Sequence, residues 1–370
     1  MKCEIEFLPV GTGSKAGDAI VVRYGDVAGY SLMLIDGGHV ETGDNIVAHL
    51  KKNFGPFPVL EHVVLTHSDG DHASGLRTVL SEIPVRNLWM HIPWFHAEDT
   101  RLLFFNKGIA AEALAKAIKA EYPVISELYD LAVAGGTKIF APFQGEAIGP
   151  FRVCSPAREA YNYLMPQFEK TPEPDQTTIE AASMWLGKES LARKLIEAAK
   201  AALQGWVKET WDGELLKDGG ITSASNESSV ILYGSFENDE RVLFTGDTGV
   251  NGLRWAAIYA ESVGLPLQQF TFIQIPHHGS RRNVGPTILN RLLGETKPQF
   301  TPPRFHAFVS APQDDARHPR RIVLNAFARR GGSVMATQGQ GIVHWGGFPA
   351  RPGYNVGETL PFYTDVEEYA

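Results

Sequence analysis

The sequence predicts an α/β fold in which two β-sheets lie face to face between outer helices. Apolar runs rich in β-branched residues occur in both halves of the chain and alternate with amphipathic helical patterns. No unit of about 20–50 residues repeats along the chain. Two packed sheets with helices on the outside accommodate this order of elements.

Length and composition are those of a globular protein. The 370 residues suffice for one large domain or two ordinary ones, and 44% are hydrophobic and 21% charged. No run approaches the roughly 18 apolar residues that a membrane span needs. The opening residues lack the layout of a secretory leader, and Cys3 and Cys154 stand in apolar runs, where core positions are expected. A cytoplasmic protein without a membrane span is therefore expected.

Charge is distributed unevenly along the chain. The formal net charge is −8, yet residues 271–351 contain eleven Lys or Arg and only three acidic residues. The rest of the chain is correspondingly more acidic. This split predicts one basic face on an acidic body.

The first part of the chain, residues 1–155, is expected to form half of the sandwich. A glycine-rich loop at 11–14 follows the first strand. The region 107–134, rich in Ala, Lys, Glu and Leu, predicts a helical hairpin or one long helix. The other helices are expected at 43–53 and 73–83. Strands are expected at 3–10, 19–24, 31–35, 61–66, 86–92, 137–141 and 151–154.

The alternating pattern of strands and helices is interrupted between residues 156 and 225. We interpret this region as a largely helical insertion or lid. Pro172, Pro174 and neighbouring acids make 169–177 irregular, whereas apolar residues at helical spacing predict a helix over 189–211. Three tryptophans are expected to pack this helix onto the body rather than to bind a ligand: Trp185, Trp206 and Trp211.

The β pattern resumes in the second half of the sandwich, residues 226–350, and residues 351–370 form a C-terminal tail. A helix is expected at 319–330, with Pro319 at a favourable first position. The strands are expected at 229–233, 241–245, 271–275, 307–310, 333–337 and 341–345.

The most informative motif is the run THSDGDH at residues 66–72. It contains four side chains that can bind metal: His67, Asp69, Asp71 and His72. The run follows a strand pattern and precedes a helical one, and Gly70 allows the backbone to turn between the ligands. A lone Asp or His here would be an ordinary helix-capping residue. Four together favour metal binding.

Other predicted strands end in residues of the same chemistry. Asp36 follows the strand 31–35, and Asp247 ends the segment Thr-Gly-Asp. The paired His277 and His278 follow another strand, and His318 precedes the helix at 319–330. Each of these residues alone would be an ordinary turn or helix-capping residue. Because several strand ends carry such residues, the sequence predicts that they form one site.

This mixture of imidazole and carboxylate suits two metal ions about 3.5–4 Å apart, with Asp247 as the bridging ligand. Metal binding lowers the pKa of a water from 15.7 to about 7, so a metal-bound hydroxide would serve as nucleophile without a Ser or Cys. The predicted ligands are His67, Asp69, Asp71, His72, Asp247, His278 and His318.

These motifs together resemble the metallo-β-lactamase superfamily. Within it, the segments 67–72, 245–247, 276–280 and 318–319 are similar to the hydrolase domain of ComEC-like bacterial competence proteins. The resemblance covers about residues 1–155 and 226–345. It implies a four-layer αββα sandwich and two divalent metal ions, Zn or Mn.

The sequence departs from the family pattern at two points. One bears on the identity of the metal, and the other on a histidine ligand that relatives usually have. Position 69 is Asp where many relatives have His, which makes Mn²⁺ more competitive with Zn²⁺. The usual histidine between the ligand loop and the bridging Asp is not evident. His91 and His96 are candidates for that ligand, and His278 is preferred. The membrane channel of the competence proteins has no counterpart, so DNA uptake is not carried over.

The sequence therefore predicts a metal-dependent hydrolase. Asp71, Asp247 and His277 are the expected catalytic residues, with His277 either supporting the ligands or donating a proton to the leaving group. Asp36 is expected to organise the ligand loop by hydrogen bonding.

A phosphodiesterase or nuclease is the favoured activity, with nucleic acid or another phosphate-containing molecule as substrate. Arginine suits phosphate recognition, and five arginines stand beside the ligand motifs. They are Arg281, Arg282, Arg317, Arg320 and Arg321. The alternative is a hydrolase of a small carboxylic ester, lactone or amide. A second alternative is a non-catalytic binding protein on the same scaffold.

Overall fold

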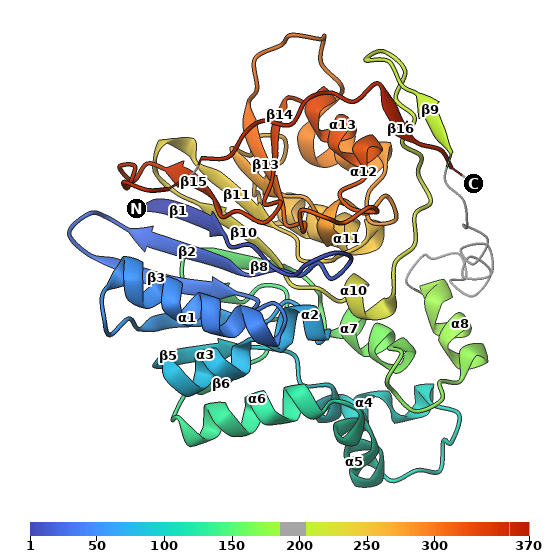
Figure 1. The fold of residues 1–370 in the computed structure, drawn as a ribbon. Helices are drawn as coiled ribbons and strands as arrows, with labels where there is room; N and C mark the ends of the chain where they lie inside the picture. Colours follow the sequence, from blue (N-terminus) through green and yellow to red (C-terminus); the bar gives the residue numbers. More distant parts are fainter. Residues whose placement is uncertain (186–204, 355, 370) are drawn as a thin grey trace.

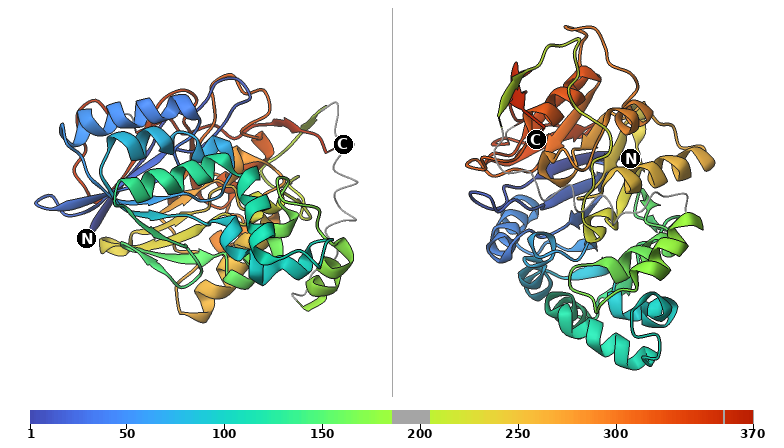
Figure 2. Two further views of the ribbon diagram at one scale, coloured as in Figure 1. Left: turned by 90° about the horizontal axis from the view of Figure 1, so that it is seen from below. Right: turned by 90° about the vertical axis from the view of Figure 1, so that its right-hand side faces the viewer.

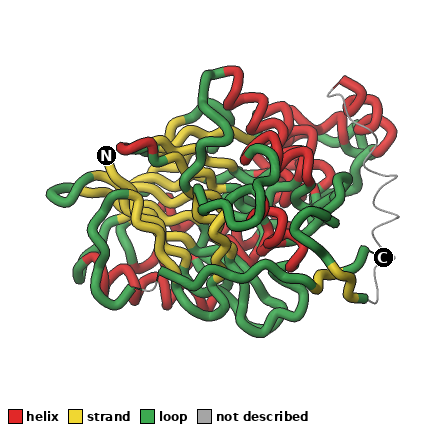
Figure 3. The backbone as a smooth tube through the Cα atoms, turned by 90° about the horizontal axis from the view of Figure 1, so that it is seen from above, coloured by secondary structure: helices red, strands yellow, loops and turns green. Residues whose placement is uncertain are grey.

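The computed structural model describes residues 1–185, 205–354 and 356–369, and two seven-stranded sheets form its centre. The sheets pack face to face, and helices cover both outer sides (Figure 1). Two further views show the same layering of helix, sheet, sheet and helix (Figure 2), and the strands occupy the middle of the molecule (Figure 3). The predicted αββα fold class is confirmed.

The first sheet combines an antiparallel and a parallel part. Its order is β15-β1-β2-β3-β4-β5-β6, and the pairs from β3 to β6 are parallel. Its strands are β1 (Lys2–Phe7), β2 (Ile20–Gly25), β3 (Tyr30–Ile35), β4 (Leu60–Val64), β5 (Val85–Trp89), β6 (Lys138–Phe140) and β15 (Ile342–Gly346).

The second sheet has the same division. Its order is β14-β13-β12-β11-β10-β8-β7, and the pairs from β11 to β14 are parallel. Its strands are β7 (Ala147–Ile148), β8 (Phe151–Ser155), β10 (Ile231–Ser235), β11 (Arg241–Phe244), β12 (Phe272–Gln274), β13 (Phe305–Val309) and β14 (Gly332–Ala336).

Helices cover the first sheet on one side of the molecule and the second sheet on the other (Figure 1). Over the first sheet lie α1 (Val40–Phe54), α2 (Gly70–Ala73), α3 (Leu76–Glu82), α5 (Ala111–Glu121) and α6 (Pro123–Ala134). Over the second lie α11 (Val250–Ser262), α12 (Pro286–Leu293) and α13 (Arg321–Arg329). The short helices α4 (Ala97–Thr100), α7 (Arg158–Leu164), α8 (Gln176–Trp185) and α10 (Ala224–Glu227) lie in the connections. In the described residues, no helix combines the length and apolarity needed to cross a membrane.

The region 107–134 forms a hairpin of α5 and α6 rather than one long helix. The helix breaks before Pro123, because proline lacks the N–H that would continue the hydrogen-bond ladder. The helices α11 and α12 lie where the sequence analysis placed none.

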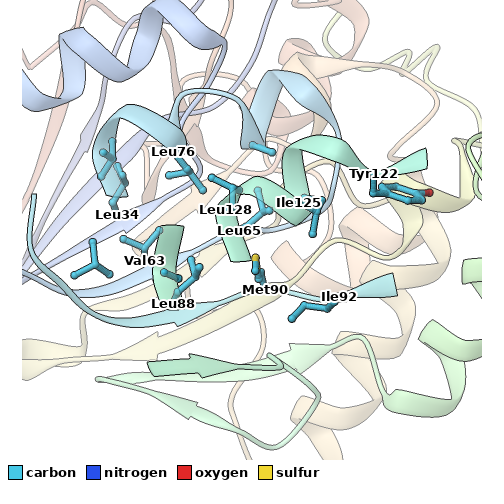
Figure 4. Close-up of a cluster of buried hydrophobic side chains, with 14 of the residues drawn as sticks. Leu34, Val63, Leu65, Leu76, Leu88, Met90, Ile92, Tyr122, Ile125 and Leu128 are labelled. Carbon is cyan, nitrogen blue, oxygen red and sulfur yellow. The ribbon is translucent and has the colours of Figure 1, made fainter. Parts of the chain in front are cut away.

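Three apolar layers hold the sandwich together. Between the sheets, the ring of Phe272 lies 5.9 Å from that of Phe7 and 5.1 Å from that of Phe308. Cys3 is buried in this layer as a free thiol, as expected. Figure 4 shows part of the outer layer, in which side chains of the first sheet such as Leu88 meet those of α3 and α6.

The middle of the chain departs from the sequence prediction. Residues 186–204 lie outside the described residues, so most of the helix expected over 189–211 is not tested. From Trp206 the prediction of a helix is wrong, because β9 (Trp206–Lys208) pairs antiparallel with β16 (Asp365–Glu367). The partner strand comes from the segment expected to be a tail, so local periodicity could not reveal the pairing.

The described tryptophans in this region differ in their surroundings. Trp211 packs onto the body from a turn rather than from the predicted helix, with its ring against Phe362 and its indole N–H donated to the carbonyl of Lys297. Trp206 is 59% exposed, and the guanidinium of Arg321 lies over its ring.

A histidine chain joins strands of the two sheets away from the candidate site. The Nδ1 of His306 in β13 lies 2.8 Å from the Nδ1 of His344 in β15. The Nε2–H of His344 donates to Glu240 at 2.8 Å. Burial, together with the neighbouring His344, lowers the pKa of His306 to about 4, although Glu240 acts in the opposite direction.

The hydrogen-bonded pair of His306 and His344 predicts a defined pH dependence of the protein's stability. Below pH 6.5 the unfolded chain binds a proton at His306, but the folded chain does not until about pH 4. The free energy of unfolding should therefore fall as the pH drops through this window. In His306→Asn, whose amide can still donate to His344, the fall should be smaller when urea unfolding is measured at pH 7.5, 5.5 and 4.5. Equal falls in both proteins would contradict the assignment.

Candidate metal centre

The candidate site forms where the parallel strands of both sheets end. Asp36 follows β3, and the ligand loop 67–72 follows β4. Asp247 follows β11, and the paired histidines follow β12. Because the carboxyl ends of parallel strands meet at one edge, the two sheets deliver these side chains to a common point.

Four residues form the centre of the site: Asp71, His72, Asp247 and His278. One potential ligand atom from each lies within 4.8 Å of the others. The Oδ2 of Asp247 lies 3.3 Å from the Nε2 of His72 and 3.7 Å from the Nε2 of His278. The side chain of Asp71 is one-third exposed and lies at the open side of the group. We call these four residues the central group.

The central group has the features expected of a metal site. Among the described residues, the Nε2 atoms of His72 and His278 and the Oδ1 of Asp247 are buried without a hydrogen-bond partner. The Nε2 of the neighbouring His67 is also buried without a hydrogen-bond partner. Buried polar atoms are nearly always paired, so unpaired ones that face each other need another partner. The donor set of imidazole and carboxylate fits divalent Zn or Mn.

Charge in the group favours a bound cation. Burial disfavours the charged form of His72, yet the carboxylates of Asp247, Asp36 and Asp71 raise its pKa well above the ordinary value. Burial likewise opposes ionisation of Asp247, but its histidine neighbours hold its pKa well below the usual range. The site therefore keeps its carboxylate ionised and attracts positive charge.

Asp36 forms hydrogen bonds to the ligand loop. Its Oδ1 accepts the N–H of Thr66, and its Oδ2 accepts the Thr66 hydroxyl and the Nδ1–H of His72, all at 2.7 Å. The Thr66 hydroxyl lies 3.1 Å from the Nδ1 of His67. These bonds occupy the Nδ1 side of both imidazoles and leave each Nε2 facing the site.

His67 and Asp69 lie beside the central group. The Nε2 of His67 is 3.6 Å from the Oδ2 of Asp69, and the rings of His67 and His72 are 4.3 Å apart. Asp69 also accepts the hydroxyl of Ser225 at 2.8 Å. The motif at 66–72 therefore directs all four of its candidate ligands toward one region.

The paired histidines occupy different positions. His278 donates its Nδ1–H to the carbonyl of Ser310, which leaves Nε2 for the central group. The Nε2 of His277 lies 3.7 Å from the Oδ2 of Asp247, and its side chain is 29% exposed. Both residues have positive φ, 47° and 55°, a conformation that is uncommon outside glycine.

His318 lies farther out. Its ring is stacked parallel to that of His277 at 6.3 Å, and its Nδ1 lies 3.4 Å from Asp315. Burial and the nearby His278 lower its pKa to about 4, so the ring is neutral near pH 7 and its nitrogens can act as ligands. His318 is outside the central group in this geometry.

A cleft of about 520 Å³ leads to the candidate site. Its lining includes Asp71, His277, His278 and His318, together with residues 14–16 and 39–41. The Nε2 of His39 lies 2.9 Å from the carbonyl oxygen of Ala16, which ties segments 14–16 and 39–41 together. Lys15 and Glu41 bring opposite charges to the cleft.

None of the five candidate substrate arginines is among the residues that line this cleft in the described part of the chain. Arg281 donates to the carbonyl of Glu368 and lies over the ring of Tyr369. Arg321 contacts Trp206 and Tyr363. Arg320 is buried, whereas Arg282 and Arg317 are exposed, and Arg317 directly precedes His318.

His91 and His96 lie elsewhere. The ring of Tyr161 stacks on His91 at 4.3 Å and lies 5.1 Å from His96. Burial lowers the pKa of both histidines. Neither belongs to a candidate metal group in the described residues, whereas His278 does.

Several polar residues of the site were not singled out by the sequence analysis. Asn283 accepts the Nδ1–H of His277 and donates to the carbonyls of Asp247 and Thr248. Asp18 and Gln274 form a buried hydrogen bond next to the central group. Single Asn, Gln and Asp residues carry little signal, and only the position of Asp18 after the glycine-rich loop could have drawn attention to it.

Comparison with known proteins agrees with this geometry. The model of the metallo-beta-lactamase superfamily matches residues 15–158, which include Asp36 and the ligand loop. A search of curated proteins finds no match.

Solved structures are also similar to this chain, at low sequence identity. The metallo-beta-lactamase fold protein YhfI from Bacillus subtilis is 11% identical, with 94% of this chain and 100% of that chain covered and a TM-score of 0.41. Zn(2+)-bound PqqB from Methylobacterium extorquens is also 11% identical, with coverages of 92% and 99% and a TM-score of 0.38.

The close approach of the glycine-rich loop to the ligand loop gives a prediction. A Cβ on Gly17 would lie 2.4 Å from the carbonyl oxygen of Asp71. Gly17→Ala should therefore displace Asp71, weaken binding of Mn²⁺ or Zn²⁺ at least tenfold, and cost about 1–3 kcal/mol of stability. Isothermal titration with each metal checks the first effect. Gly29→Ala, at a position with open space, is the matched control. Equal metal affinity in both variants would contradict the predicted placement.

Proposed function

We propose that this protein is a metal-dependent hydrolase, most closely related to the ComEC-like branch of the superfamily, and that it cleaves phosphodiesters, including those of nucleic acid. The observation that carries the hydrolase proposal is the central group, in which buried imidazole and carboxylate atoms face each other without hydrogen-bond partners. Two divalent ions, Zn or Mn, would supply Lewis acidity and a lowered pKa of bound water.

The ligand assignment follows the geometry. Asp247 is the proposed bridging carboxylate, since its Oδ2 lies within 3.7 Å of three imidazole Nε2 atoms, those of His72, His277 and His278. His67 and Asp69 would hold one side of the pair, and Asp71 the other. His318 would complete the set from the cleft wall.

His277 is the proposed proton donor to the leaving group. It lines the cleft and is more exposed than the neighbouring His278, so a substrate can reach it. Its Nδ1–H is held by the Oδ1 of Asn283 at 3.0 Å, which aims Nε2 toward the site. Burial lowers the pKa of His277, whereas the Asp247 carboxylate, 3.7 Å from Nε2, favours the protonated ring from which a proton donor must start.

Charge supports a phosphate substrate. Residues 271–351 form the basic part of an otherwise acidic chain, and they supply His277, His278 and His318. Arg317 is exposed next to His318, and Lys15 is another residue that lines the cleft. Arg281 and Arg321 contact the C-terminal segment, so Arg317 and Lys15 are the better candidates for phosphate contacts.

A neutral ester, lactone or amide is the second candidate substrate class. Its support is the part of the cleft lining that contains the exposed Val40 and the acidic Glu41. Such a surface accepts an uncharged acyl group more readily than a second phosphate.

The proposed function predicts metal-dependent cleavage of bis-p-nitrophenyl phosphate in preference to p-nitrophenyl acetate. Asp247→Ala should lower kcat/KM by about a hundredfold or more, because one ion cannot stabilise both the attacking and the leaving oxygen. Ser280→Ala, which changes a buried hydroxyl nearby, should cost less than about fivefold. The assay is run on metal-free protein supplied with Mn²⁺ or Zn²⁺.

Three other outcomes would contradict parts of the proposal. Preferential acetate hydrolysis would favour the second substrate class. Metal binding without turnover of either compound would favour a binding protein. Loss of activity in Ser280→Ala equal to that in Asp247→Ala would point to a covalent mechanism.

A further inference from the structure

The side-chain amide of Gln274 connects the two halves of the sandwich directly beneath the central group. Gln274 ends β12 and is 1% exposed. Its Oε1 accepts the backbone N–H groups of Thr245 and Gly246 at 2.9 and 3.0 Å. Its Nε2 donates to the Oδ2 of Asp18 at 2.8 Å. All three contacts are buried, so none is shared with solvent.

Each end of this connection lies beside a candidate ligand. Thr245 and Gly246 form the turn that presents Asp247, and Gly246 has a positive φ of 51°. Asp18 is 1% exposed, and its Oδ2 lies 4.0 Å from the Nδ1 of His72. The preceding Gly17 contacts the backbone of Asp71. The connection therefore links ligands from the first half of the chain to a ligand from the second.

We propose that Gln274 is a positioning residue that, through Asp18, holds the turn bearing Asp247 in register with the ligand loop of the other sheet. This inference rests on the proposed metal centre and assigns a role to two residues outside its ligand set. Gln274 is not among the candidate ligands, and it acts through its hydrogen bonds to Thr245, Gly246 and Asp18.

The chemistry at this position calls for an amide. The oxygen side of Gln274 meets two N–H donors, and the nitrogen side meets a carboxylate, so only one orientation of the amide satisfies all three partners. A glutamate of the same shape would keep the oxygen side but would place a second carboxylate oxygen against Asp18. Two buried carboxylates without a donor between them repel each other and displace the segments that carry them.

The test exchanges the amide and the carboxylate between positions 274 and 18. In Gln274→Glu, affinity for Mn²⁺ or Zn²⁺ should fall at least tenfold. Asp18→Asn alone should change the affinity by no more than about threefold, because the asparagine oxygen can still accept from Gln274. The double variant should recover most of the affinity lost in Gln274→Glu, because the new asparagine amide then donates to the carboxylate introduced at position 274. Isothermal titration with each metal alone gives these values.

A matched control separates positioning from general destabilisation. Gln144 also donates its Nε2 to a single buried partner, the carbonyl of Cys154, at 2.9 Å, and it lies outside the site. Gln144→Glu should lower the thermal midpoint without changing metal affinity. If Gln144→Glu weakened metal binding as much as Gln274→Glu, the effect would be one of stability and the inference would be wrong.

A measurement without metal distinguishes this inference from the proposed function. Hydrogen exchange of a peptide that covers Thr245 and Gly246 should be faster in Gln274→Glu and return toward the wild-type rate in the double variant. If the wild-type protein bound no ion but the variants showed these exchange rates, the proposed metal centre would be wrong. The proposed positioning of the Asp247 turn by Gln274 would still stand. Unchanged exchange and affinity in Gln274→Glu, or no recovery in the double variant, would overturn the inference.

Discussion

The burial of Asp247 is the constraint on which the rest of the site depends. This carboxylate is 2% exposed, its Oδ1 has no hydrogen-bond partner among the described residues, and three imidazoles face its Oδ2. A buried charge is tolerated only when it is paired or binds a metal. The histidines satisfy the carboxylate partly, and the unpartnered Nε2 atoms of His72 and His278 face the same point. Bound cations would satisfy both groups at once.

The ligands around Asp247 come from both sheets, so the site depends on how the whole sandwich is assembled. The first sheet supplies the ligand loop and Asp36, whereas the second supplies Asp247 and His278. The two sets meet only if the sheets pack in a fixed register, which the aromatic layer around Phe272 maintains. Polar bonds across the sheets, such as that between Gln274 and Asp18, add directional control that apolar packing lacks.

Local patterns in the sequence predict much of this arrangement. The run 66–72 combines a strand end, a turn and four ligand types, and its chemistry is visible without a structure. Strand ends that carry Asp247 and His278 follow the same logic, because parallel strands share an edge. The fold class followed from the alternation of strand and helix patterns, which reflects burial along each element.

What the sequence could not reveal depends on contacts between distant segments. The pairing of β9 with β16 joins residues far apart in the chain, so the helical periodicity extrapolated through Trp206 was misleading. The basic run suggested arginines in the cleft, yet Arg281 and Arg321 contact the C-terminal segment. Asp18 and Gln274 are ordinary residues in the sequence and become informative only when their side chains meet.

The proposed binding of two metal ions around Asp247, by residues from both sheets, can be tested in crystals of the protein grown with Mn²⁺ or Zn²⁺. Diffraction is measured on either side of the metal's absorption edge. Two anomalous peaks about 3.5–4 Å apart are expected, with Asp247 between them and His72 and His278 in contact. An absence of peaks in this group at saturating metal, or peaks only elsewhere in the chain, would contradict it.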